Sequence, residues 1–171
     1  MLEASAGSAT DLSVLQLAAD GRVGGDDDFV FFNNRQAAGG AVRLRGGDDA
    51  HRCRVDLNGL PDRVIRIVFV ASTERPVPGE AAPRVTVTAL SGWQAMFSLP
   101  GTPPVTALVL AEMYRRDGAW RLRAIGQGYQ DGLAGRARDF GVDVDSVAEL
   151  IRDGARDCGV TPGSGRDSAK S

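Results

Sequence analysis

The chain has 171 residues, of which 43% are hydrophobic and 25% are charged, a balance typical of a folded protein rather than a disordered one. The formal net charge of −2 gives no electrostatic reason to hold a polyanion, and aromatic residues amount to only 6%, so the composition argues against nucleic-acid binding. A chain of this length buries enough surface to build one domain around one core.

Signals for targeting are absent from the sequence. No apolar run reaches the roughly 18 residues that a membrane span needs, and the first residues lack the basic start and apolar centre of a secretory signal. Nothing in the sequence pairs Cys53 with Cys158. We therefore expect a cytoplasmic protein with no membrane span and with reduced cysteines.

The pattern of short apolar segments predicts strands. Residues 1–10 are small and polar, and we expect them to be disordered. The run Phe29–Phe32 stands between aspartates and asparagines, as a fully buried strand would. Further alternating or β-branched segments lie at 41–45, 55–57, 64–70, 84–90, 93–99, 105–114 and 120–123. Many short strands separated by turns rich in glycine and proline favour an antiparallel β-sandwich.

The pattern changes after the last of these strands. Apolar residues recur at helical spacing over 133–140 and again over 147–158. The predicted fold is therefore mainly β, an antiparallel β-sandwich with one or two C-terminal α-helices. The expected organisation is a disordered N-terminus over 1–10, a domain over 11–145, a C-terminal helix over 146–160 and a disordered tail over 161–171.

The sequence contains few of the residues and motifs that are typical of an enzyme active site. The single histidine, His51, follows Asp48 and Asp49, and such a group could act as a general base or bind a metal. No phosphate-binding loop, Gly-x-Ser-x-Gly or Cys-x-x-Cys motif is present, and no motif places a nucleophile near the histidine. We predict no catalytic residue; an enzyme that uses His51 with Asp48 or Asp49 is the alternative.

Carboxylates gather at three places: the run 26–28, the pair 48–49, and Asp11. Hard cations such as Ca²⁺ take roughly six to eight oxygen ligands, and loops at one end of a sandwich could bring these groups together. A four-residue strand spans about 13 Å, however, so Asp28 and Asn33 need not serve one ion. Solvated acidic turns are the alternative, because adjacent aspartates repel each other and seek water.

An ordered set of motifs resembles a known family. The stretch Asp26-x-Asp28-Phe29-Val30-Phe31-Phe32-Asn33-Asn34, followed by Gly40-Ala41-Val42 and Val55-Asp56-Leu57, resembles the TerD family of bacterial tellurium-resistance and general-stress proteins. The resemblance resumes at Ala111-Glu112-Met113-Tyr114-Arg115 and at Gly118-Ala119-Trp120-Arg121-Leu122, and it covers about residues 11–145.

This resemblance implies a β-sandwich that binds calcium through acidic loops and acts in resistance to tellurite and other stresses, with no enzymatic activity. It implies metal-ligand roles for the acids that match the family's D-x-D-F, G-D-D-E and D-L-D segments, which are Asp26 and Asp28, Asp48 and Asp49, and Asp11.

The sequence also departs from the family pattern. Ser13 stands at the second acid of D-L-D, Ala50-His51 replace a terminal glutamate, and Arg43 and Arg45 precede the acidic pair. Fewer carboxylates and nearby arginines weaken the attraction for a cation, so we expect weak, partial or absent Ca²⁺ binding. The family's N-terminal strands, with their G-W-D segment, are missing, which would leave a sheet edge open to self-association or to a protein partner. The eroded acidic loop and the apolar stripe over 147–158 favour an alternative function, a metal-independent protein-interaction module in a bacterial stress-response complex.

Overall fold

The computed structural model describes residues 1–6, 11–47, 50–77, 85–97 and 105–129. The strands are β1 (Leu2–Ala6), β2 (Asp11–Leu17), β3 (Phe29–Val30), β4 (Gln36–Ala37), β5 (Val42–Gly47), β6 (Ala50–Val55), β7 (Arg66–Val77), β8 (Val85–Ala89), β9 (Gln94–Phe97), β10 (Val105–Arg116) and β11 (Ala119–Tyr129). Two short 3-10 helices, η1 (Asp26–Asp28) and η2 (Ala38–Gly40), precede β3 and β5.

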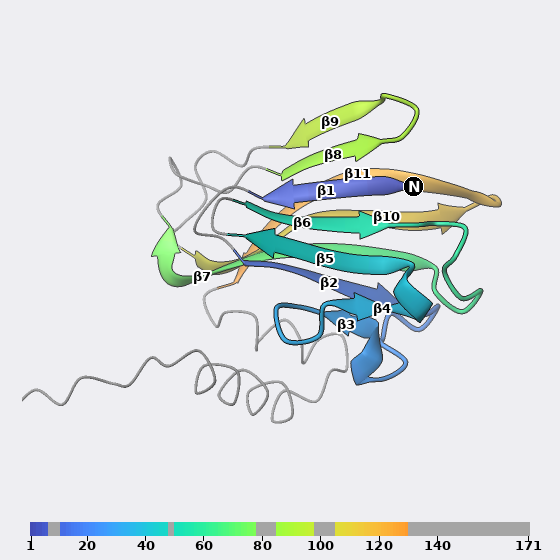
Figure 1. Ribbon diagram of the computed structural model, residues 1–171, viewed down its shortest axis with the longest axis horizontal. Coiled ribbons are helices and arrows are strands. Elements are labelled where there is room, and N and C mark those ends of the chain that lie inside the picture. Colours follow the sequence, from blue (N-terminus) through green and yellow to red (C-terminus); the bar gives the residue numbers. More distant parts are fainter. Residues whose placement is uncertain (7–10, 48–49, 78–84, 98–104, 130–171) are drawn as a thin grey trace, which may run out of the picture.

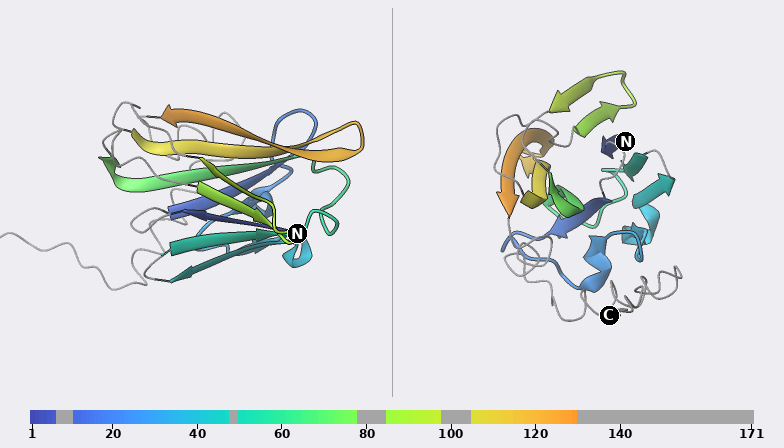
Figure 2. Two further views of the ribbon diagram at one scale, coloured as in Figure 1. Left: turned by 90° about the horizontal axis from the view of Figure 1, so that it is seen from above. Right: turned by 90° about the vertical axis from the view of Figure 1, so that its left-hand side faces the viewer.

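The strands form two antiparallel sheets packed face to face. Sheet A has the order β4-β5-β6-β1-β8-β9, and sheet B has the order β11-β10-β7-β2-β3. The views in Figures 1 and 2 show sheet A lying over sheet B as two layers. The predicted antiparallel β-sandwich is confirmed.

Alternation along the strands separates the core from the surface. In β5 and β6 the apolar side chains face the space between the sheets and are buried, whereas the arginines between them are exposed. The strands β2, β7 and β10 of sheet B are buried on both faces over long runs of consecutive residues. In β7, Ile67 and Phe69 join the core between the sheets, while their neighbours Val68 and Val70 join a second apolar cluster.

The amino-terminal residues correct one expectation. Residues 2–6 were expected to be disordered, yet they form β1, which pairs with β6 on one side and with β8 on the other. Leu2 and Ala4 are buried in the core between the sheets. The order of this segment comes from backbone pairing along both of its edges, which its small side chains do not reveal.

The run Phe29–Phe32 corrects a second expectation, that all four residues form one buried strand. Only Phe29 and Val30 are in a strand, because the chain turns at once: the backbone N–H of Phe31 donates to the carbonyl of Asn34 at 2.9 Å. The side-chain amide of Asn34 donates to the carbonyl of Phe29 at 2.8 Å and closes the turn. Phe31 folds back and stacks on Phe29 with a centroid distance of 4.9 Å, and Phe32 is left exposed.

The expected C-terminal helices over 133–140 and 147–158 and the tail over 161–171 lie outside the described residues, as does Cys158. In the part of the chain that the structure describes, no helix is long and apolar enough to cross a membrane. Cys53 is buried in sheet A, and burial raises the pKa of its thiol to about 12. A neutral, buried thiol is unreactive at physiological pH.

One polar side chain inside the sandwich has no hydrogen bond. Gln16 shares its face of β2 with Leu12 and Val14, so its amide points between the sheets, where the residue is fully buried. Neither Oε1 nor Nε2 of Gln16 has a partner among the described residues. A buried amide in this condition costs about 1–3 kcal/mol of stability.

Replacing Gln16 by methionine keeps the side-chain length and removes the two unpaired polar atoms. We predict that Gln16→Met raises the melting temperature by a few degrees, since about 1 kcal/mol corresponds to roughly 2–4 °C in a chain of this size. Thermal and urea unfolding followed by circular dichroism measure the change. Gln36→Met, at an exposed position of β4, is the control and should leave the melting temperature unchanged. A lower melting temperature for Gln16→Met would contradict the prediction and indicate that the amide has a partner.

Candidate functional site

Asp28, one of the expected metal ligands, is held by an arginine. It is the last residue of η1, and its side chain is only 4% exposed. Arg63 donates to both carboxylate oxygens, from Nη1 to Oδ2 at 2.6 Å and from Nη2 to Oδ1 at 2.9 Å. The backbone N–H of Gly24 adds a third hydrogen bond, to Oδ2 at 2.7 Å. Both oxygens of Asp28 are therefore engaged within the protein.

The space beside the Asp28–Arg63 ion pair is too small for a further side chain. A Cβ at Gly24 would lie 2.8 Å from Asp28 Oδ2 and 3.0 Å from Arg63 Nη1, so the pair requires a residue without a side chain at this position. The hydrogen bond to Asp28 raises the pKa of Arg63 above its ordinary value, so the guanidinium is positive throughout the accessible pH range. A cation at Asp28 would have to displace this guanidinium.

Asp11 lies at the other end of β2. Its carboxylate Oδ1 is 3.4 Å from Nδ1 of His51 in β6, and the imidazole packs over the bare backbone of Gly46, its cross-strand partner. The carboxylate of Asp11 is 52% exposed and the imidazole 29% exposed, so both groups are open to solvent. A carboxylate beside an imidazole can orient a proton donor or contribute oxygen and nitrogen to a metal.

The strand register separates the two acidic groups. Leu15 of β2 pairs with Phe29, the residue after Asp28, whereas Asp11 lies four residues earlier on β2. Four residues of strand span about 13 Å, so Asp28 and Asp11 do not face one point. Asp26 and Asp27 are exposed in η1 beside Asp28 and therefore lie at that same end.

The remaining expected ligands, Asp48 and Asp49, lie outside the described residues. They connect β5 to β6, whose last described pairs are Gly46 with His51 and Gly47 with Ala50. Among the described residues, no group of three or more histidine, cysteine, aspartate or glutamate side chains could hold a metal ion. Metal binding by Asp26, Asp28, Asp48, Asp49 and Asp11 stays a prediction. Of the expected ligands that the structure describes, Asp11 is the one that lies beside His51.

Sequence reasoning missed two of these partnerships. Arg63 is 35 positions from Asp28, and no local pattern connects the two residues. His51 was considered only with its sequence neighbours Asp48 and Asp49, although the pairing of β6 within sheet A and of β2 within sheet B also brings Asp11 beside it. The first contact depends on the pairing of β3, β2 and β7 within sheet B, and the second on how the two sheets stack, neither of which strand patterns alone give.

The ion pair at η1 gives a direct test of what Asp28 does. Arg63→Ala leaves a buried carboxylate without its partner, so we predict a loss of about 2–3 kcal/mol in the free energy of unfolding. Chemical denaturation measures the loss. Arg22→Ala removes an exposed arginine from the loop between β2 and η1 and should change the stability by less than about 0.5 kcal/mol. Equal, small effects of both changes would show that the pair contributes nothing.

Comparisons with known proteins agree with the fold and the motifs. The TerD domain model matches residues 3–140. The chain is 33% identical over 150 residues to a tellurium resistance protein TerD from an Alcaligenes species, covering 78% of each chain. It is 34% identical over 137 residues to chemical-damaging agent resistance protein B of Clostridium acetobutylicum, covering 70% of this chain and 97% of that one.

A solved structure has the same architecture. The crystal structure of a homologue of telluride resistance protein from Streptomyces coelicolor A3(2) superposes with a TM-score of 0.62 at 16% identity, covering 80% of this chain and 94% of that one. At this identity the superposition supports the fold alone. With the family match over most of its length and these two relatives, this chain belongs to the TerD family.

Proposed function

We propose that this chain is a stress- and tellurite-resistance protein that acts by binding rather than by catalysis, and that it binds Ca²⁺ weakly. The relatives named for resistance to tellurium and to chemical damage support the first part. The observation that carries the weakness of binding in the second part is the engagement of Asp28 by Arg63, which removes one expected ligand. Asp11 is exposed and lies beside His51, away from the exposed Asp26 and Asp27 of η1.

The proposed cation site therefore centres on Asp11, with Asp48 and Asp49 as the further carboxylates that the family resemblance implies. Asp11 offers an open oxygen, and His51 beside it occupies a place where the family pattern has an acid. A site with few carboxylates and a neighbouring imidazole holds Ca²⁺ less tightly than a site rich in acids, because the ion's charge is less well matched. We infer binding in the range of about 10⁻⁴–10⁻³ M, which other weak protein calcium sites show.

Calorimetric titration and thermal unfolding with Ca²⁺ test this site. At 10 mM Ca²⁺ we predict a higher melting temperature, because a ligand that binds only the folded state stabilises it. Asp11→Asn should abolish most of this stabilisation, whereas Asp28→Asn and Asp26→Asn, both at η1, should leave the Ca²⁺ response unchanged. No heat and no stabilisation at 10 mM Ca²⁺ would refute the cation site. A response lost in Asp28→Asn but kept in Asp11→Asn would move the site to η1.

A second candidate function is self-association through the edge of sheet A. In the described part of the chain β9 pairs only with β8, and Figures 1 and 2 show this hairpin projecting beyond the body of the sandwich. Three large apolar side chains on the hairpin are exposed, with exposed fractions of 73% for Leu90, 51% for Trp93 and 63% for Met96. An edge strand with free backbone groups can pair with a second copy of itself, and exposed apolar side chains stabilise such a contact.

We predict that the wild-type chain forms a dimer whose fraction increases with protein concentration, and that Met96→Lys shifts it to monomer. A lysine on an edge strand opposes pairing because the charge would have to be buried at the contact. Light scattering coupled to size-exclusion chromatography measures the mass. Ser91→Lys, in the turn of the same hairpin, adds the same charge outside the strand and should keep the dimer. A monomer at every concentration would exclude this second candidate.

A further inference from the structure

The outer face of sheet A carries arginines arranged in like-charged pairs. Arg43 of β5 lies directly opposite Arg54 of β6, and Arg45 lies opposite Arg52. All four side chains are exposed, because the apolar residues between them face the core. Like charges directly opposite each other destabilise a sheet. The strands therefore hold four positive charges in an arrangement that a bound anion would relieve.

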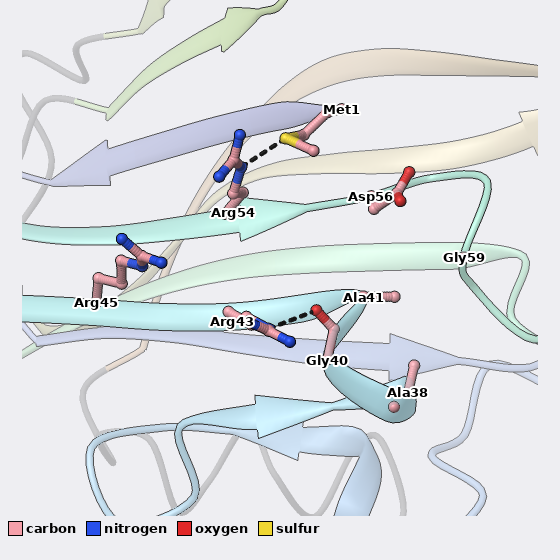
Figure 3. A pocket seen from close by; sticks show the side chains of 10 residues that line it. Met1, Ala38, Gly40, Ala41, Arg43, Arg45, Arg54, Asp56 and Gly59 are labelled. Atoms are coloured by element: carbon pink, nitrogen blue, oxygen red, sulfur yellow. Dashed lines mark hydrogen bonds between the residues drawn. The ribbon is translucent and has the colours of Figure 1, made fainter.

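Three of these arginines line a pocket. Arg43, Arg45 and Arg54 surround a hollow of about 340 Å³, which we call the arginine pocket. Figure 3 shows the three arginines on neighbouring strands of this face. The other lining residues are mostly small: Ala38, Gly39, Gly40, Ala41 and Gly59, with Met1 and Asp56. A volume of this size lies at the lower end of the range for small-molecule sites.

Contacts on the Nε side hold two of the guanidinium groups. Arg43 donates from Nε to the carbonyl of Gly40 at 2.9 Å, and Arg54 donates from Nε to the thioether sulfur of Met1 (Figure 3). Arg43 lies against Gly40 so closely that a Cβ there would stand 2.5 Å from its Nη2. The Nη groups of both arginines have no acceptor among the described residues, and Arg45 has none for its whole guanidinium there.

Few carboxylates balance this charge. Glu3 of β1 reaches Arg52 at 3.8 Å, with both side chains about half exposed. Asp56 directly follows β6, and its Oδ1 accepts a hydrogen bond from the backbone N–H of Asn58 at 3.2 Å. Four guanidinium groups on the described part of this face thus meet two carboxylates, although the whole chain has a net charge of −2. The positive charge is local, and it is concentrated at the pocket.

We propose that the arginine pocket binds the diphosphate group of a small molecule. Guanidinium groups bind phosphate oxygens bidentately, and the small lining residues allow an anion to approach the backbone. Cross-strand neighbours lie about 5 Å apart and next-but-one residues along a strand about 7 Å apart, a spread better matched by two linked phosphates than by one. Among the residues that the structure describes, no aromatic ring and no large apolar side chain besides Met1 lines the pocket, so recognition is directed at the charged group.

Titration calorimetry with inorganic diphosphate in calcium-free buffer of low ionic strength tests this proposal. We expect binding that weakens with salt. Arg45→Gln is the informative variant, because Arg45 makes no described contact that the fold would lose. It should weaken diphosphate binding about tenfold or more, while the melting temperature without ligand stays equal or rises because a like-charged pair is gone.

Arg121→Gln is the matched control. It removes an exposed arginine from β11 of sheet B, changes the net charge equally, and should leave diphosphate binding unchanged. Equal weakening by both variants would overturn the proposal, because only general electrostatics would then remain. Absence of binding at millimolar diphosphate, or binding of nucleic acid without binding of diphosphate, would overturn it as well.

Two further experiments identify the source of the diphosphate group and distinguish this proposal from the proposed cation site. A nucleoside diphosphate that binds more tightly than inorganic diphosphate would identify an esterified ligand, and equal affinities would identify the free anion; either result supports the pocket. Asp11→Asn should leave diphosphate binding intact, since Asp11 does not line the pocket. The arginine pocket and the proposed Ca²⁺ site can therefore fail independently.

Discussion

The alternation of apolar and arginine residues along β5 and β6 is the constraint on which both faces of sheet A depend. Val42, Leu44, Cys53 and Val55 are buried between the sheets, so the residues between them must point outward. A register shift of one residue would bury arginines and expose this core, which fixes the pairing strongly. The same register places Arg43 opposite Arg54. Core packing therefore enforces the clustering of positive charge that forms the arginine pocket.

Charged side chains in the interior and charged side chains on the outer face of sheet A differ in how they are paired. Buried carboxylates are matched within the chain: Asp28 by Arg63, and Glu112, only 1% exposed, by Arg66 at 2.6 Å and Arg123 at 2.5 Å. Leaving such groups unpaired would cost several kcal/mol, which explains the close geometry. The arginines of β5 and β6 are solvated, so no comparable penalty forces them to be paired inside the molecule. Their excess is compatible with folding and is available to a ligand.

The sequence predicts the parts of this structure that depend on local patterns. Alternation located β5 and β8, and the turn-rich spacing predicted the sandwich. β1 was missed because Leu2 is its only large apolar residue and its order comes from pairing with β6 and β8. The contact Asp28–Arg63 joins distant segments through strand pairing in sheet B, and Asp11–His51 joins them through the stacking of the two sheets, so no local pattern encodes either contact. The overall charge of −2 argued against a polyanion site because it averages over faces of opposite sign.

The wall of the arginine pocket shows how the backbone supports the charge cluster. Ala38, Gly39 and Gly40 in η2 have φ values of 50°, 61° and 92°, all in the left-handed region. This conformation favours glycine, and a side chain at Gly40 would also meet the guanidinium of Arg43. The turn between β4 and β5 thus brings a bare carbonyl to Arg43 Nε and leaves the Nη edge of that arginine without a described acceptor. A residue with a side chain at Gly40 would both strain the turn and displace the arginine, so the local conformation and the charge at the pocket depend on the same glycine.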